Sequence, residues 1–139
     1  MKPNKVCPVL LRNKRDDLQI LAFRHPLTGF QLVKGTIEKD ESPEAAVLRE
    51  LFEESGIDSA SIIRHLGIWE SNYENQIWSL YLCEAEQLAD EWTHHTQDGG
   101  GLDFSFFWHS LNENSDAAWQ PLFQEALQWI KRTIVALQD

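Results

Sequence analysis

The stretch that decides the fold covers residues 35–57 and reads GTIEKDESPEAAVLRELFEESGI. Its second half has the marks of a helix: Ser42 suits the N-cap, Pro43 the first helical position, and Gly56 the C-terminal cap. Between these boundaries, apolar residues recur at spacings of one, three and four, which predicts an apolar stripe along one helix face. The stripe consists of Val47, Leu48, Leu51 and Phe52.

Three glutamates are predicted to project from the face opposite this stripe. At about 100° per residue, Glu53 lies about 60° to one side of Glu50, and Glu54 about 40° to the other. Arg49 precedes Glu53 by four residues, the spacing of an ion pair that could hold that carboxylate in place. The cluster has two interpretations: a charged, solvated helix face, or an oxygen-rich site for a hard divalent cation.

The composition limits the classes of function. A chain of 139 residues with 42% hydrophobic content predicts a single domain over residues 1–139. Its formal net charge of −10 argues against a general nucleic-acid binder and against a protein that binds anionic membranes. A divalent cation on the glutamates would let such an acidic protein hold a polyphosphate, which favours the metal interpretation.

The cysteine content and the N-terminus indicate the compartment. Cys7 and Cys83 are too few and too far apart for a disulfide scaffold or a zinc site. The N-terminal residues lack the apolar segment of a signal peptide, and no stretch approaches about 18 uncharged apolar residues. We therefore expect a soluble, cytoplasmic protein. Its sequence leaves both a monomer and a homodimer open.

Apolar stretches and turn-prone segments alternate along the rest of the chain. They predict strands at residues 6–11, 18–23, 30–33, 62–73, 77–83 and 102–108. The polar residues 84–101 are predicted to form a loop with at most one helical turn, near residues 86–90.

A final amphipathic helix is predicted from Pro121 onward, because apolar residues recur there at helical spacing. Since strands interleave with two helices, the sequence predicts an α/β or α+β domain with helices on both faces of a sheet. The residues of the final helix predicted to face the core are Leu122, Ala126, Trp129, Ile130, Ile134 and Leu137.

Residues 35–57 resemble the Nudix box, G-x5-E-x7-R-E-U-x-E-E-x-G-U with U a bulky apolar residue, at every defined position. The flanking strands, the hairpin and the final helix are similar to this family as well. The resemblance implies an α/β/α sandwich with a mixed sheet between helices. It also implies a pyrophosphohydrolase that uses Mg²⁺ or Mn²⁺ to cleave a nucleoside diphosphate linked to another moiety.

The resemblance also implies the metal ligands. They are the carboxylates of Glu50, Glu53 and Glu54, together with the backbone carbonyl of Gly35. Glu53 and Glu54 count among the catalytic residues too, because metal ions neutralise charge on phosphate oxygens and lower the pKa of a coordinated water.

Two further catalytic residues follow from the same resemblance. Arg49 looks like the family's orienting arginine, which acts on the neighbouring carboxylates. Glu41 is similar to the loop glutamate, which either braces the loop or assists as a base. The box does not fix the general base, and the polar region after residue 84 offers three more candidates. These are Glu91, Asp98 and Asp103.

Weaker marks bear on the substrate. Tyr73 comes sixteen residues after the box, a position that resembles the diadenosine polyphosphate hydrolases. Residues 32–35 resemble the L-P-K-G sequence of related enzymes, except that valine replaces the proline, and Lys34 could contact a phosphate there. Trp92, in the predicted loop, could stack on a base. Each of the three also has a purely structural interpretation: Tyr73 as a core residue, Lys34 as a solvated residue and Trp92 as a loop residue.

Other substrates and one other class of function stay open. Nucleoside triphosphates, including oxidised ones, and the 5′ triphosphate end of RNA are the competing substrates. ADP-ribose hydrolases of this family typically carry a proline after the box. It is missing here, since no proline lies between Pro43 and Pro121. A Nudix-fold module that binds a nucleotide without cleaving it usually loses box acids, and all of them are present here. The expected partner is a small nucleotide, not bulk nucleic acid or a membrane.

Overall fold

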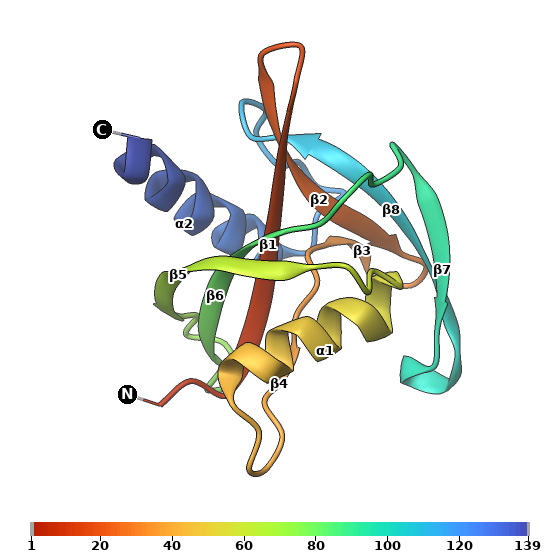
Figure 1. Cartoon of the computed structure of the whole chain (residues 1–139), viewed down its shortest axis with the longest axis vertical. Helices are drawn as coiled ribbons and strands as arrows, with labels where there is room; N and C mark the ends of the chain where they lie inside the picture. Colours follow the sequence, from red (N-terminus) through yellow and green to blue (C-terminus); the bar gives the residue numbers. More distant parts are fainter. Residues whose placement is uncertain (1, 139) are drawn as a thin grey trace.

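A computed structural model describes residues 2–138, apart from the side chain of Asp98 (Figure 1). The strands are β1 (Lys5–Lys14), β2 (Asp17–His25), β3 (Gly29–Gln31), β4 (Gly35–Thr36), β5 (Ser61–Glu70), β6 (Ile77–Glu84), β7 (Trp92–Thr96) and β8 (Leu102–Ser110). The helices are α1 (Pro43–Ser55), α2 (Pro121–Gln138) and the short 3-10 turn η1 (Asp98–Gly100).

Within these residues the strands form one mixed sheet in the order β5-β6-β1-β2-β8-β7. β3 pairs with β2, and β4 pairs with β1. β1 and β6 are parallel, whereas the other paired strands are antiparallel. The pairing of the short β4 with β1 places Gly35 opposite Val6, near the start of the central strand.

Both faces of the sheet are covered, as predicted. Successive side chains of a strand point to opposite faces. Cys7 and Val9 of β1 accordingly join a core cluster with the buried residues of α2. Val6 and Leu10 join a second cluster, which contains the buried apolar residues of α1. Figure 1 shows the two helices on different sides of the sheet. The predicted α/β/α sandwich with a mixed sheet is confirmed.

The predicted boundaries of α1 are confirmed by its caps. The Ser42 hydroxyl accepts a hydrogen bond from the backbone N–H of Ala45 at 3.1 Å, and Pro43 begins the helix. At the other end, Gly56 takes a left-handed conformation with φ 80°, which glycine adopts without steric cost. Its N–H donates to the Phe52 carbonyl at 2.8 Å. These local contacts define α1 independently of the sheet.

Helix α2 begins at Pro121, as predicted, and buries most of the predicted residues. Its last buried residue is Ile134, and Trp129 is half-buried. Leu137 was predicted to face the core, but it is 42% exposed, so that prediction is wrong. The buried face of the helix ends about one turn before Leu137, which leaves this leucine beyond the core.

The strand predictions need four corrections, the first being the short β4, which was not predicted. β3 ends at Gln31, so residues 32–33 lie outside it. β5 ends at Glu70, and Tyr73 therefore lies in the turn after the strand and not at its end. Residues 92–96 form the edge strand β7, although the whole region 84–101 was predicted to be a loop, and residues 86–90 form no helical turn. A polar edge strand such as Trp92–Thr96 lacks the apolar alternation on which the prediction relied.

Cys7 and Cys83 are buried free thiols. Burial raises the pKa of Cys83 to about 12, so its thiol is unreactive near neutral pH. Among residues 2–138, no helix has both the length and the apolar character that a membrane crossing requires.

Candidate functional site

The box glutamates are not all on one solvated face. Glu50 and Glu54 are only 8% and 7% exposed, on the side of α1 that faces the sheet, whereas Glu53 is exposed. The predicted placement of all three opposite the apolar stripe is therefore wrong. Phe52, predicted to lie in that stripe, is 52% exposed. Leu51 is buried beside the two glutamates, because residues three and four positions apart share a helix face.

Strand β4 brings the backbone of Gly35 directly against the Glu50 carboxylate. A Cβ atom on Gly35 would overlap the Cδ, Cγ and Oε2 atoms of Glu50. Only glycine therefore permits this approach. The carbonyl-bearing backbone of Gly35 and the Glu50 carboxylate, two of the implied metal ligands, lie side by side at the start of the sheet.

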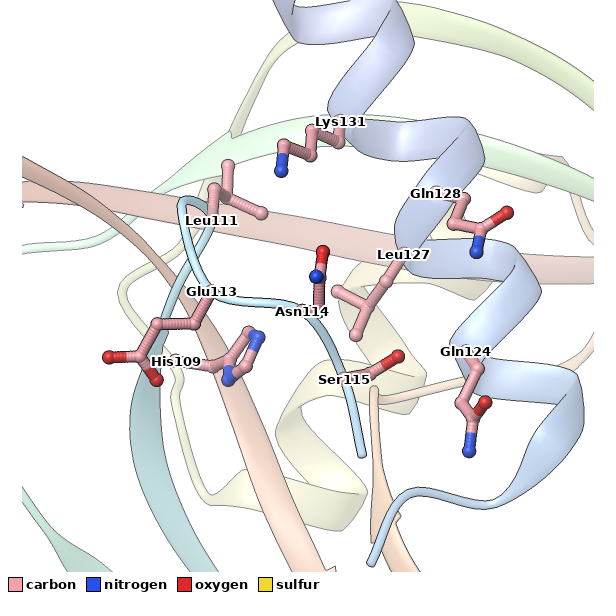
Figure 2. A pocket seen from close by; sticks show the side chains of 9 residues that line it. All are labelled: His109, Leu111, Glu113, Asn114, Ser115, Gln124, Leu127, Gln128 and Lys131. Atoms are coloured by element: carbon pink, nitrogen blue, oxygen red, sulfur yellow. The ribbon is translucent and has the colours of Figure 1, made fainter. Parts of the chain in front are cut away.

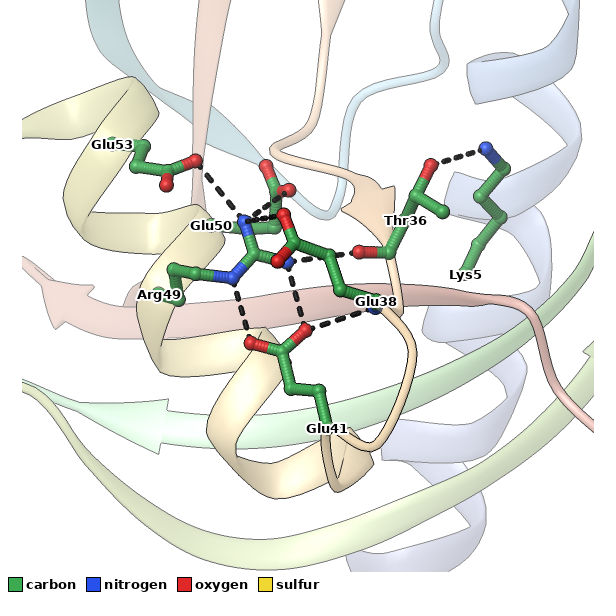
Figure 3. Close-up of polar contacts among 7 residues, drawn as sticks. All are labelled: Lys5, Thr36, Glu38, Glu41, Arg49, Glu50 and Glu53. Carbon is green, nitrogen blue, oxygen red and sulfur yellow. Dashed lines mark hydrogen bonds and ion pairs between the residues drawn. The ribbon is translucent and has the colours of Figure 1, made fainter.

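The Arg49 guanidinium links the members of the cluster (Figure 3). Its Nε and Nη2 atoms donate to the two carboxylate oxygens of Glu41 at 2.7 and 2.9 Å. Nη2 also donates to the Thr36 carbonyl at 2.9 Å. Nη1 donates to Glu50 at 2.9 Å and to Glu53 at 3.1 Å. The ion pair that the spacing of Arg49 and Glu53 indicated is present, within a larger network.

The network affects the protonation of Glu41. The hydrogen bonds from Arg49, and then the backbone N–H of Glu38 at 3.0 Å, lower the pKa of Glu41 to about 2. The hydrogen bonds to Glu41, and then the one to Glu50, raise the pKa of Arg49 above its usual value. A carboxylate with so low a pKa is a poor general base near neutral pH. Of the two roles open for Glu41, the geometry favours that of a brace between the loop and Arg49.

The donors of the cluster suit a hard cation. Carboxylate and carbonyl oxygens from Glu50, Glu53, Glu54 and Gly35 match the preference of Mg²⁺ and Mn²⁺ for oxygen, and no sulfur or imidazole takes part. In the part of the chain that the structure describes, no three acidic, histidine or cysteine side chains form a complete cage. Mg²⁺ does not need one, because it keeps waters and uses phosphate oxygens as ligands. The residues present fit the implied metal.

Lys34 lies next to Gly35 and is half-buried. Its Nζ atom donates to Oε1 of Gln76 at 3.2 Å. Burial lowers the pKa of Lys34, and the nearby charge of Glu54 acts in the opposite direction. The sequence did not single out Gln76, because this contact joins residues 42 positions apart.

Tyr73 lies in the turn between β5 and β6, where its side chain is 43% exposed. It lines an open cavity of about 400 Å³ between this turn and the start of α2. The aromatic ring is therefore accessible to a ligand. The other residues that line this cavity are Ser71, Asn72, Gln120, Pro121, Leu122 and Glu125.

Trp92 begins β7, so the expectation that it lies in a loop is wrong. Its ring stacks on Phe106 with 5.1 Å between centroids and 8° between planes. Its Nε1–H donates to the Ser55 carbonyl at 2.9 Å, at the end of α1. The protein thus covers one face of the indole, which favours a structural role for this residue.

Strand β7 makes a second contact with α1, which the sequence did not predict. The Nε2 atom of His94 lies 3.1 Å from the Glu53 carbonyl oxygen, and its ring packs where a Cβ of Gly56 would be. Among the general-base candidates, Asp103 contacts His95 Nδ1 at 2.8 Å. Glu91 is exposed just before β7, and the side chain of Asp98 lies outside the described residues.

A separate cavity of about 120 Å³ lies between α2 and the segment that follows β8 (Figure 2). His109 lines it, and burial lowers the pKa of this histidine. None of the predicted site residues lines this cavity. The other lining residues are Leu111, Glu113, Asn114, Ser115, Gln124, Leu127, Gln128 and Lys131.

Comparison with known proteins agrees with this geometry. A family model described as NUDIX domain matches residues 1–130. An RNA pyrophosphohydrolase from a Nitratiruptor species is 39% identical over 72 residues, which cover 50% of this chain and 46% of that protein. The match therefore spans about half the length of that relative.

Solved structures share the fold. An ADP-ribose pyrophosphatase from Streptococcus suis 89-1591 has a TM-score of 0.69 and 18% identity, covering 99% of this chain and 94% of that chain. An Ap4A hydrolase from C. elegans has a TM-score of 0.65 and 19% identity, covering both chains completely (100% and 100%). At these identities the similarity supports the architecture and not the substrate.

Proposed function

The chain belongs to the NUDIX domain family, and we propose that it is a metal-dependent pyrophosphohydrolase acting on a nucleoside diphosphate linked to another moiety. The observation that carries this proposal is the packing of the buried Glu50 carboxylate on Gly35, beside Arg49. We propose that residues 1–139 act as one domain, and that the partner is a small nucleotide.

In this proposal, Glu50, Glu53, Glu54 and the Gly35 carbonyl would hold Mg²⁺ or Mn²⁺, which supplies positive charge for the phosphate oxygens and activates water. Arg49 orients two of these carboxylates through its Nη1 atom. Glu41 holds Arg49 with two hydrogen bonds, so that the guanidinium keeps its position. The chain thus orders its own negative charge before the anionic substrate arrives.

We propose a dinucleoside polyphosphate as the substrate. Two observations support it: the accessible ring of Tyr73 on the wall of an open cavity, and the ammonium of Lys34, the residue before Gly35, held by Gln76. Lys34 would bind the phosphate chain, and Tyr73 would stack on one base. Trp92 is the weaker candidate for stacking, because Phe106 covers one face of its ring.

A second candidate substrate is the 5′ end of RNA. The observation that favours it is the identity of 39% over 72 residues with a protein named RNA pyrophosphohydrolase. The formal net charge of −10 disfavours a long polyanion, because the charge that repels phosphate extends beyond the metal site. The two candidates differ in how much nucleic acid the protein must accommodate.

A substrate panel tests the proposal. With Mg²⁺ present, diadenosine tetraphosphate is expected to have a higher kcat/KM than ATP, dGTP, ADP-ribose or a 5′-triphosphorylated RNA oligonucleotide. Phosphate or nucleotide release is measured at matched concentrations. A panel in which diadenosine tetraphosphate is the poorest substrate contradicts the proposed substrate. Binding without hydrolysis of any compound would identify a nucleotide-binding module instead.

Replacing Tyr73 with alanine is expected to weaken substrate binding by about 1–3 kcal/mol, the range of base–aromatic stacking. The loss should appear mainly in KM, because stacking holds the base equally in the ground state and the transition state. Tyr73→Phe keeps the ring and should retain near-wild-type KM. An equal loss for inorganic tripolyphosphate, which has no base, or a lowered melting temperature without a KM change would contradict stacking.

A further inference from the structure

The Lys34 side chain carries a positive charge into a partly apolar environment. Its Nζ atom lies 5.6 Å from the ring centroid of Trp78 and 5.8 Å from that of Phe123. Both aromatic residues belong to the core cluster between the sheet and α2, Phe123 as a residue of that helix. Burying an ammonium group is unfavourable unless polar or aromatic groups compensate it. A leucine or methionine would fill the same space without this cost, so packing alone does not explain a lysine here.

The polar group that compensates Lys34 is the side-chain amide of Gln76, which is only 8% exposed. Its Oε1 atom accepts a hydrogen bond from the Nε1–H of Trp78 at 3.0 Å. The indole N–H can only donate, and therefore the amide oxygen, not the amide nitrogen, must face it. The same oxygen accepts from Lys34 Nζ at 3.2 Å. Trp78 thus fixes the orientation of the Gln76 amide, and the amide oxygen fixes the position of the Lys34 ammonium.

The backbone of Gln76 has a separate, structural role in the turn between β5 and β6. Its N–H donates to the Tyr73 carbonyl at 2.9 Å, and its carbonyl accepts from the N–H and hydroxyl of Ser71 at 3.2 and 2.8 Å. These contacts close the turn between β5 and β6 without using the side chain. A substitution of the Gln76 side chain therefore disturbs Lys34 while leaving the bonds of this turn in place.

We propose that Gln76 is a positioning residue that fixes the ammonium of Lys34, the residue directly before Gly35, so that it binds the phosphate chain of the substrate. The inference rests on the proposed function in one respect, namely that the substrate carries phosphates. A lysine side chain has four rotatable bonds, and free rotation would spread its charge over a large volume. The amide oxygen and the two aromatic rings confine that charge before substrate binds.

The identity of the residue also matters. A neutral amide accepts the hydrogen bond and leaves the full positive charge of Lys34 available to phosphate oxygens. A glutamate at position 76 would accept the same bond but form an ion pair, which cancels the charge in this partly buried place. The neutral acceptor is therefore suited to a lysine that must attract an anion.

Calorimetric titration with Mg²⁺-loaded tripolyphosphate tests the proposal, because this probe has phosphates but no base. Gln76→Met removes the acceptor at similar volume and is expected to weaken binding about tenfold. Gln76→Glu keeps both hydrogen bonds and the fold, and should weaken binding at least as much. Lys34→Met should lose about as much as Gln76→Met, and the double variant should lose no more than Lys34→Met alone.

Ser79→Ala is the matched control, because Ser79 is a buried polar residue of β6, the strand that begins directly after Gln76, and contacts His65 at 2.8 Å and not Lys34. This variant should lower the melting temperature without changing the affinity for tripolyphosphate. For hydrolysed substrates, Gln76→Met should raise KM and leave kcat unchanged, a split that a purely structural defect would not produce.

The outcomes separate this proposal from the proposed function. Wild-type affinity in Gln76→Glu, additive losses in the double variant, or no binding of tripolyphosphate by the wild type would overturn the positioning role. If the predicted binding pattern appears but the wild type hydrolyses no nucleotide, the role of Gln76 stands and the proposed hydrolysis fails. Should Gln76→Met not fold, Gln76→Glu and Lys34→Met decide the question.

Discussion

Glu54→Gln is expected to lower kcat on the order of 10³-fold or more, the scale of losing a metal ligand that acts in the transition state. Glu54 lies on the buried side of α1 and is 7% exposed. Glutamine has nearly the same volume, so the substitution removes charge without creating a cavity. The rate is measured at saturating substrate and Mg²⁺, and thermal melting reports the fold, which should remain intact.

Glu44→Gln provides the matched control for this experiment. Glu44 is an exposed residue of the same helix, and its carboxylate accepts a hydrogen bond from the Tyr81 hydroxyl at 3.1 Å, away from Arg49. Its replacement should leave kcat unchanged, whereas Glu50→Gln should resemble Glu54→Gln. A near-wild-type rate in Glu54→Gln would mean that the metal assignment is wrong.

The boundaries of α1 could be predicted because they depend on local chemistry. The Ser42 hydroxyl, the fixed φ of Pro43 and the left-handed conformation of Gly56 act within one helical turn of their own positions. The complete box within residues 35–57 identified the family for a similar reason, since its residues are close in sequence. Local features of this kind can be predicted from the sequence without knowledge of how the sheet is arranged.

The orientation of α1 could not be predicted in the same way. A classification of residues as apolar or polar assigns Phe52 to the core and Glu50 and Glu54 to solvent, and the structure shows the reverse. The helix places Glu50 near the sheet because Gly35 has no Cβ that would fill this space. Carboxylates on a buried face violate the usual pattern, and for this reason periodicity misassigned them.

Contacts between segments that are distant in the sequence could not be predicted either. Strand β7 is defined by pairing with β8 and not by its own polar residues. Gln76 meets Lys34 only because the parallel pairing of β1 and β6, together with the pairing of β1 and β4, brings their segments to one end of the sheet. Strand pairing determines which distant residues become neighbours, and the residue spacing within either segment does not predict these contacts.

Removal of divalent cations is expected to abolish turnover, and addition of Mg²⁺ or Mn²⁺ should restore it. The reason is electrostatic: Glu50, Glu53 and Glu54 would repel a polyphosphate without a cation, in a chain whose formal net charge is −10. The experiment compares turnover in excess EDTA, after removal of bound metal by dialysis, with turnover after each cation is added back.

The protein's own binding of the metal must be distinguished from metal carried in by the nucleotide. Without any nucleotide, Mg²⁺ should raise the melting temperature, because a ligand that binds only the folded state stabilises it. This shift should shrink in Glu54→Gln and persist in the control Glu44→Gln, whose carboxylate contacts Tyr81. Undiminished turnover in the chelator, or an equal shift in both variants, would contradict a catalytic metal held by the buried face of α1.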